Sequence, residues 1–242
     1  YSNNNLHTSI WPVYLDKDSI CNNCEIYDSA TYLIEKEYKN YSFIVNPILN
    51  LSFNYDKDKS LYGKYNTGIS KRGKLYENIN YSFDFYYSKY QYPFYIRSAI
   101  DSTGIIPHHG KFIKKQDGYY FAAFNGYLSY KASDYLRFVL GKNRNFLGEG
   151  YRSLFLSENS NSIPSLKAIV DIWKVKYLII YSKINDVNSF IGPSDLYNKY
   201  CTTHYLSWNA GKNFNFNLFE SVIWRGEDSL GTRGFDINYL NP

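Results

Sequence analysis

The chain has 242 residues with a formal net charge of +5, and its 27 basic and 22 acidic residues are interspersed, so nucleic-acid binding is unsupported. No stretch approaches the roughly 18 consecutive apolar residues of a membrane-spanning helix, which excludes that mode of insertion. Tyrosine is unusually frequent, with 28 copies. Such enrichment is typical of the aromatic girdles of membrane β-barrels and of carbohydrate-binding surfaces.

The first 40 residues are the least regular part of the chain. Asp28 to Tyr38 starts with a capping residue and predicts a short helix. We therefore expect residues 1–40 to form an irregular and partly helical periplasmic lead-in or plug. Cys21 and Cys24 have CxxC spacing. Because no second pair or histidine cluster accompanies them, we favour an incidental or locally bridged pair over a redox or metal site.

Apolar and polar residues alternate from Pro47 onward, which is typical of β-strands with one apolar face. The clearest run is Ile79 to Tyr87, after a turn expected at Lys71-Arg72-Gly73. The positions of the opposite parity are polar, and in a barrel they would line the lumen, where the lysines are interpreted as a solvated wall. The expected lumen-lining residues are Asn78, Asn80, Asp84, Lys167, Asp171, Lys174 and Lys176.

Later runs predict hairpins. Tyr120 to Tyr130 and Leu136 to Leu140 alternate on either side of the turn residues Ala132 to Asp134. The apolar parity changes near Ile172, which predicts either a turn or a bulge there. A last hairpin is expected around Gly211-Lys212-Asn213. One irregularity is that the run before and after the parity change also carries apolar residues on its opposite face, namely Ile169, Leu178 and Ile180.

About ten strand candidates emerge from this alternation. Short turns alternate with long connections at Tyr90 to Tyr119, Asn143 to Pro164 and Lys183 to Lys199, a pattern that fits short periplasmic turns and long outer loops. We therefore predict an all-β fold, an antiparallel transmembrane β-barrel whose wall occupies residues 41–242 and continues beyond the C-terminus. Two alternatives stay open: a soluble, secreted, Tyr-rich β-sandwich that binds carbohydrate, and a diffusion porin.

The segment Gly141 to Leu166, GKNRNFLGEGYRSLFLSENSNSIPSL, followed by Ile172-Trp173-Lys174, resembles the Wzi family of capsule-assembly outer-membrane barrels. The positions that carry this resemblance are Asn143, Arg144, Phe146, Gly148, Gly150, Ser153, Leu154, Leu156, Ser157, Asn159, Ile163 and Pro164. Within that family the chain is most similar to the RemB-type gliding-motility proteins of Bacteroidota, through Tyr200 to Leu206, Leu218-Phe219-Glu220 and Phe235 to Pro242.

The resemblance implies a bacterial outer-membrane barrel of about 18 strands, of which this chain is the N-terminal part. It implies a non-enzymatic protein without a cofactor. Such a protein binds or organises surface polysaccharide, or serves the gliding and surface-secretion machinery. The expected partners are outer-membrane lipid, surface polysaccharide, and gliding or secretion-system proteins.

The loop that follows Gly141 is the candidate site. A charged, glycine-rich loop can fold inward and plug a barrel. It can also bind acidic or hydroxyl-rich polysaccharide, because guanidinium groups match carboxylates and aromatic rings stack on sugars. We favour the plug, and the two roles are compatible. The candidate residues are Arg144, Phe146, Glu149, Tyr151, Arg152 and Glu158.

No catalytic or metal-binding constellation is predicted. His108 and His109 are adjacent and would point to opposite faces of a strand, and no third ligand accompanies them. We expect them in a loop. His204 is expected to make a polar contact in the lumen. Its pairing with a nucleophile such as Ser157 would lack the third member that a hydrolase requires.

Overall fold

The computed structural model describes residues 10–11, 33–55, 61–148, 153, 155–157, 159–185, 198–211, 213–228 and 231–241. These residues form an antiparallel β protein with one α-helix and one short 3₁₀ helix, which confirms the prediction of an all-β fold. The chain divides into two compact units. The N-terminal unit is Tyr14–Tyr127, and the C-terminal unit is Leu128–Pro242 together with Tyr1–Val13.

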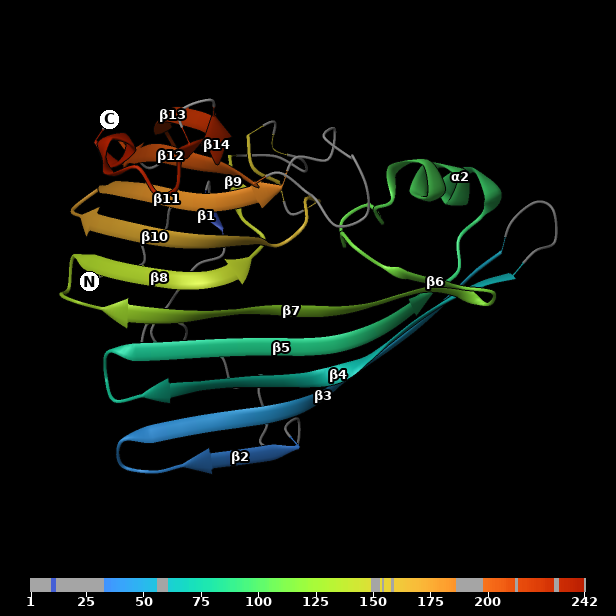
Figure 1. Cartoon of the computed structure of the whole chain (residues 1–242). Helices are drawn as coiled ribbons and strands as arrows, with labels where there is room; N and C mark the ends of the chain where they lie inside the picture. The colour runs from blue at the N-terminus through green and yellow to red at the C-terminus, as the bar shows by residue number, and fades with distance from the viewer. Residues whose placement is uncertain are drawn as a thin grey trace. The chain divides into compact units, whose positions relative to one another are not determined.

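The N-terminal unit is a sheet of consecutive antiparallel strands with a helix-bearing excursion (Figure 1). Its strands lie in the order β7-β5-β4-β3-β2, and β6 pairs with β7. Their bounds are β2 (Ile34–Glu37), β3 (Tyr41–Tyr55), β4 (Leu61–Leu75), β5 (Ile79–Tyr90), β6 (Ile113–Lys115) and β7 (Gly118–Lys131). β7 runs on into the C-terminal unit with its last residues, from Leu128.

The C-terminal unit continues with antiparallel strands in the order β13-β12-β11-β10-β8-β7. The long strands are β8 (Leu136–Asn143), β10 (Ile163–Ile172), β11 (Val175–Asn185), β12 (Asn198–Asn209) and β13 (Asn215–Arg225). The short elements are β1 (Ile10–Trp11), β9 (Phe146–Leu147), β14 (Glu227–Asp228), β15 (Gly231–Thr232) and the 3₁₀ helix η2 (Ile237–Leu240). Within the described residues the strand order is open, with β2 and β13 at its ends.

One predicted turn, near Ile172, is confirmed, and another, at Lys71-Arg72-Gly73, is wrong. The parity change near Ile172 is a tight hairpin at Trp173-Lys174, with no bulge in the β10–β11 ladder. The turn expected at Lys71-Arg72-Gly73 is wrong, because these residues lie within β4 and the turn follows at residues 76–78. Gly73 is there for packing, since a Cβ would lie 2.6 Å from the Tyr81 hydroxyl oxygen and 2.2 Å from the Ser42 carbonyl oxygen.

The start of the chain also departs from expectation. Ile34–Glu37 forms strand β2 on the edge of β3, so the helix predicted over residues 28–38 is wrong for this part, and residues 28–32 lie outside the described residues. The sheet therefore begins before the predicted boundary at residue 41. All four residues of β2 are exposed, so its pairing with β3, rather than burial of an apolar face, outweighs the local capping signal.

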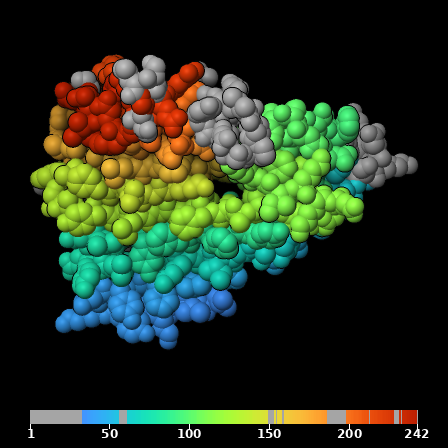
Figure 2. All heavy atoms as spheres, in the orientation of Figure 1, coloured from blue at the N-terminus to red at the C-terminus, as the bar shows by residue number. Residues whose placement is uncertain are grey.

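The ladders of the N-terminal unit place every second residue of β3, β4 and β5 on one face, here called the apolar face. Its aliphatic and aromatic side chains are exposed: Leu49 is 68% exposed, Ile69 57% and Phe85 57%. Figure 2 shows β3, β4 and β5 as adjacent bands of one face of the molecule. The opposite, polar face carries serine, asparagine and Asp84, largely half-buried. A soluble sheet has the reverse distribution.

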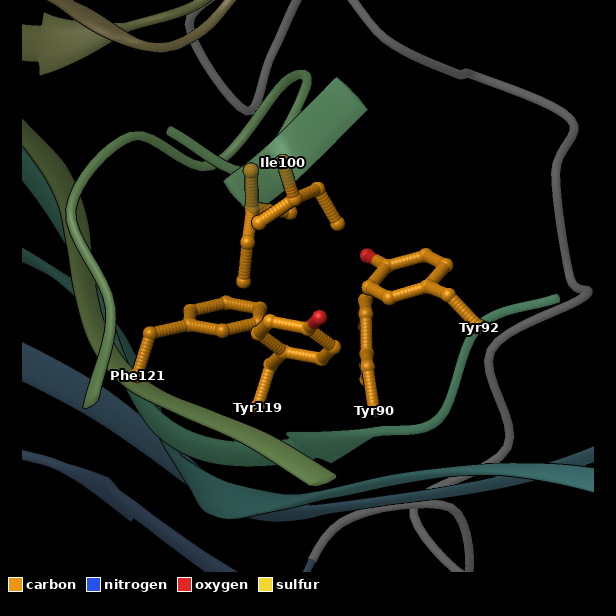
Figure 3. Close-up of a cluster of buried hydrophobic side chains, with 6 residues drawn as sticks. Tyr90, Tyr92, Ile100, Tyr119 and Phe121 are labelled. Carbon is orange, nitrogen blue, oxygen red and sulfur yellow. The ribbon is translucent and has the colours of Figure 1, made fainter. Parts of the chain in front are cut away.

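The connection between β5 and β7 contains a helix that the sequence did not predict. α2 (Phe94–Thr103) begins after Pro93 and ends at Gly104, whose φ of 67° lies in the left-handed region that favours glycine and whose N–H donates to the Ile100 carbonyl. The helix places Ile100 against the rings of Tyr90, Tyr119 and other buried aromatic residues (Figure 3). The full cluster is Tyr90, Tyr92, Ile100, Ile106, Tyr119 and Phe121.

Candidate functional site

The same two-faced pattern recurs in the C-terminal unit. The ladders put Phe138, Leu140 and Leu166 on one face, the apolar face of this unit, where Leu140 is 61% exposed and Leu166 is 44% exposed. The opposite, polar face carries Lys167, which is only 3% exposed. The exposed apolar side chains of β8 and β10 therefore share one face, as they do in the N-terminal unit.

The loop between β8 and β10 lies on the polar face. Its residue Leu147, 1% exposed, packs in one cluster with Leu178, Ile180 and Tyr205. Phe155, from the same loop, joins this cluster and stands 4.2 Å from the Phe219 ring, measured between centroids. Leu178 and Ile180, the apolar residues that interrupted the alternation of β11, thus form the surface on which the loop packs. The loop occupies the face that would be the lumen side of a barrel.

Backbone hydrogen bonds give the loop a defined shape. The Leu147 N–H donates to the Leu156 carbonyl at 3.0 Å, which closes the loop on itself. β9 also pairs antiparallel with β1, so that Ile10 stands opposite Leu147 and Trp11 opposite Phe146. A piece of the N-terminal stretch is therefore joined to the loop by sheet pairing. The lead-in or plug expected over residues 1–40 stays a prediction, since apart from Ile10 and Trp11 residues 1–32 lie outside the described residues.

One buried polar contact links the loop to the wall. Lys167 projects from β10 on the polar face, and its Nζ donates to the Asn145 side-chain oxygen. Both side chains are buried. A buried ammonium group is costly unless it is hydrogen-bonded, so the contact ties the position of the loop to that of β10. Sequence reasoning placed Lys167 on the correct face but missed Asn145, whose only signal is its place beside Arg144.

The predicted loop residues are only partly described. Arg144 follows β8 directly and is exposed, whereas Phe146 lies in β9 and is half-buried. The loop therefore presents the Arg144 guanidinium to solvent while it packs its apolar side chains on the sheet. The other candidates, Glu149, Tyr151, Arg152 and Glu158, lie outside the described residues.

Five of the seven predicted lumen-lining residues lie on a polar face: Asn80, Asp84, Lys167, Asp171 and Lys176. Asp84 accepts a hydrogen bond from the Ser70 hydroxyl at 2.5 Å. Asp171 and Lys176 face each other across the β10–β11 hairpin and form an ion pair at 3.0 Å. Asp84, Asp171 and Lys176 therefore each have a polar partner on the polar face.

The other two predicted lumen residues, Asn78 and Lys174, lie in hairpin turns rather than on the wall, because the strands end earlier than expected. Lys174 lies over the Trp173 ring, 5.3 Å from its centroid. Asn78 helps to line a groove of about 500 Å³ formed by the β2–β3 and β4–β5 turns together with Tyr38 and Tyr76.

Of the predictions for histidines, the loop position of His108 and His109 is confirmed and the position of His204 is not. His108 and His109 lie in the loop after α2, and the His109 ring packs 4.5 Å from that of Phe121. The lumen contact predicted for His204 is wrong. His204 lies on the apolar face, because its register partners Ile179 and Glu220 share that face, and it is buried there.

Comparisons with protein-family models, with curated proteins and with solved structures gave no match to this chain. In the part of the chain that the structure describes, no helix is long and apolar enough to cross a membrane. The same residues contain no group of three or more histidine, cysteine or acidic side chains placed to hold a metal ion. Cys201 is a free thiol, whereas Cys21 and Cys24 lie outside the described residues.

Proposed function

We propose that this chain forms wall of a β-barrel in a bacterial outer membrane, where it binds or organises surface polysaccharide or serves gliding and surface-secretion machinery. The observation that carries the membrane part is the exposed apolar face. Along β3, the side chains of Leu49, Leu51, Phe53 and Tyr55 are each more than half exposed. Exposing a leucine or phenylalanine to water instead of burying it costs about 1.5–3 kcal/mol. Lipid removes that cost.

A soluble β-sandwich lectin would pack the same alternate residues against a second sheet. Among the described residues of the N-terminal unit, nothing covers Leu49, Ile69 or Phe85 to that extent. The exposed face therefore favours the membrane barrel over the lectin.

The one lysine in the middle of the apolar face of β4 also fits a membrane. Lys71 directs its Nζ towards the rings of Phe43 and Tyr81, 5.1 Å and 5.9 Å from their centroids. Both rings lie one pleat nearer the β4–β5 turn than Lys71 does. The side chain thus extends along the apolar face towards the end of the strand. Snorkelling of this kind, next to aromatic residues, is typical of a membrane–water boundary.

Paired charge insertions test the membrane proposal. Ile69→Arg places a charge on the apolar face, and Asn50→Arg places one at an exposed position of the polar face. In a lipid-facing wall the first costs about 2–4 kcal/mol and the second almost nothing. We expect reduced folding yield into vesicles for Ile69→Arg alone, read from the heat-modifiable band on gels. Equal yields, or recovery of the wild-type chain in the detergent-free soluble fraction, would contradict the proposal.

The polysaccharide role rests on the resemblance and on the exposed Arg144 at the base of the inward loop. A guanidinium binds carboxylates in bidentate fashion and suits an acidic glycan. We expect Arg144→Ala and Arg152→Ala to weaken retention of surface polysaccharide while the heat-modifiable band is unchanged. Lys111→Ala, which removes another exposed loop cation, is the control. If both arginine variants retained surface polysaccharide as fully as the wild-type chain, the loop would not be a polysaccharide-binding site.

A diffusion porin is the competing barrel function. The loop that packs on the polar face of the C-terminal unit favours a plugged barrel instead, because it occupies the side on which a channel would run. High ion conductance in planar bilayers would count against this arrangement.

A further inference from the structure

The apolar face of the C-terminal unit changes character over part of β12 and β13, whereas Trp208, Phe216 and Leu218 near the β12–β13 turn keep it apolar and exposed. Where β8 and β10 expose leucine and phenylalanine, the register of β12 and β13 puts Thr202, His204 and Glu220 on the same face. Polar and ionisable side chains at the lipid surface of a barrel are destabilising. This sector therefore has the wrong chemistry for lipid, although it lies on the lipid side of the proposed wall.

The structure shows what covers part of this sector. The segment from Gly231 to Leu240, which includes β15 and η2, lies over the apolar face of β11 to β13. The Phe235 ring stands 4.5 Å from Tyr181 and the Tyr239 ring 4.6 Å from Trp224, measured between centroids. As a result Trp224, a large aromatic residue on the apolar face, is only 7% exposed.

Hydrogen bonds match the polar atoms of the segment to those of the wall. The Trp224 indole N–H donates to the Gly234 carbonyl at 3.4 Å. The His204 ring lies between two partners, with Nε2 3.0 Å from the Tyr239 carbonyl oxygen and Nδ1 2.7 Å from the Tyr177 hydroxyl. Because a carbonyl only accepts, Nε2 carries the hydrogen, and in the neutral ring Nδ1 accepts from Tyr177. The histidine that would be unfavourable in lipid is satisfied under the segment.

We propose that the outer face of β11 to β13 around Tyr181, His204 and Trp224 is a protein-covered sector of the barrel wall, occupied by the segment from Gly231 to Leu240, and that this sector does not contact lipid. This inference rests on the proposed membrane function. It goes further by dividing the apolar face of the C-terminal unit in two. β8 and β10 meet acyl chains, whereas Tyr181, His204 and Trp224 meet protein.

Tryptophan fluorescence tests the division. One variant keeps Trp224 as the sole tryptophan, with the remaining tryptophans replaced by phenylalanine. A matched control has no native tryptophan and carries Leu166→Trp, an exposed position of the apolar face that pairs with Tyr181. Both are folded into phosphatidylcholine vesicles whose acyl chains are brominated at shallow or deep positions. We expect strong quenching at residue 166 and at least severalfold weaker quenching at Trp224.

A third variant adds Phe235→Ala and Tyr239→Ala to the Trp224-only protein. Removing the two rings should raise the quenching of Trp224 towards that of residue 166, and heat-modifiable mobility reports whether the wall still folds. Equal quenching of Trp224 and residue 166 in the unmodified segment would overturn the protein-covered sector while leaving the membrane proposal intact. Absence of quenching at residue 166 would overturn the membrane proposal, and the inference with it.

Discussion

The packing of the β8–β10 loop on the polar face of the C-terminal unit can be tested with a single substitution. Leu147 is the side chain that seats the loop, since it is 1% exposed and packs with Leu178, Ile180 and Tyr205. Leu147→Ala removes most of that side chain and leaves a space that the sheet cannot readily close, because Leu178 and Ile180 project from a paired strand. The substitution should release the loop without unpairing the wall.

The size of the effect follows from the burial. Replacing a fully buried leucine by alanine costs about 2–5 kcal/mol, which is the lost transfer free energy plus a cavity term. That cost falls on docking of the loop, since the strand ladders do not use the Leu147 side chain. Because about 1.4 kcal/mol corresponds to a tenfold change in equilibrium constant, the undocked population should rise about 30-fold or more.

Hydrogen exchange in detergent micelles measures this directly. The Leu147 amide donates to the Leu156 carbonyl at 3.0 Å and should exchange at least about 30-fold faster in the variant. Amides of the β10–β11 ladder should keep their rates. Leu140→Ala is the control, because Leu140 is 61% exposed on the opposite face and its truncation should change loop exchange little. Similar rates in the two variants would refute the seating of the loop by Leu147.

Three further outcomes can be checked in the N-terminal unit. The Lys89 ammonium, which donates to Asp117 at 2.6 Å, lowers the pKa of that carboxyl to about 2. Because the pKa of Asp117 is lower in the folded chain, the ionised carboxylate stabilises the fold at pH values above its ordinary pKa of 3.8, and this stabilisation is lost as the pH falls to about 2. Resistance of the β6–β7 turn to an acid protease should therefore fall between pH 3.8 and about 2. Asp117→Asn should remove this pH dependence. Ile100→Ala should cost about 2–5 kcal/mol of local stability in α2, measured by hydrogen exchange, because Ile100 is fully buried. Gly68→Ala should weaken the β4–β5 pairing seen by the same method, since its Cβ would lie 2.1 Å from a backbone oxygen, whereas Gly63→Ala, with its nearest contact at 3.5 Å, should be tolerated.

The alternation of apolar residues predicted the faces of the strands well. The side chains expected on one face of Ile79 to Tyr87, and those after the parity change at Ile172, lie together in the ladders. Period-two patterns are reliable here because a one-residue slip would move a whole apolar set onto the polar face. Turns were less predictable. Lys71-Arg72-Gly73 has turn-like composition, but Gly73 is needed for the close approach of the Tyr81 ring.

The candidate site was predictable only in outline. The inward position of the loop depends on Leu147 and on the apolar residues Leu178 and Ile180, which the sequence shows merely as irregularities in an alternation. His204 was misplaced although it shares the parity of Leu206 and Trp208, because Thr202, Thr203 and the imidazole itself were interpreted as a polar stretch. Its position follows from a segment more than thirty residues away, as the contact with the Tyr239 carbonyl shows. A long-range contact of this kind leaves no local pattern to read.

The dimensions of β5 bear on the membrane proposal independently of exposure. On its apolar face the residues from Ile79 to Tyr87 are uncharged, and Lys89 comes next. A strand rises about 3.4 Å per residue, so this run is about 27 Å long. Tilted by about 40°, as strands of outer-membrane barrels are, it spans about 21 Å along the membrane normal, close to the apolar band of about 25 Å. Tyr87 and Lys89 then stand at one boundary and Tyr81 near the other. A soluble sheet has no reason to end its uncharged run at that height.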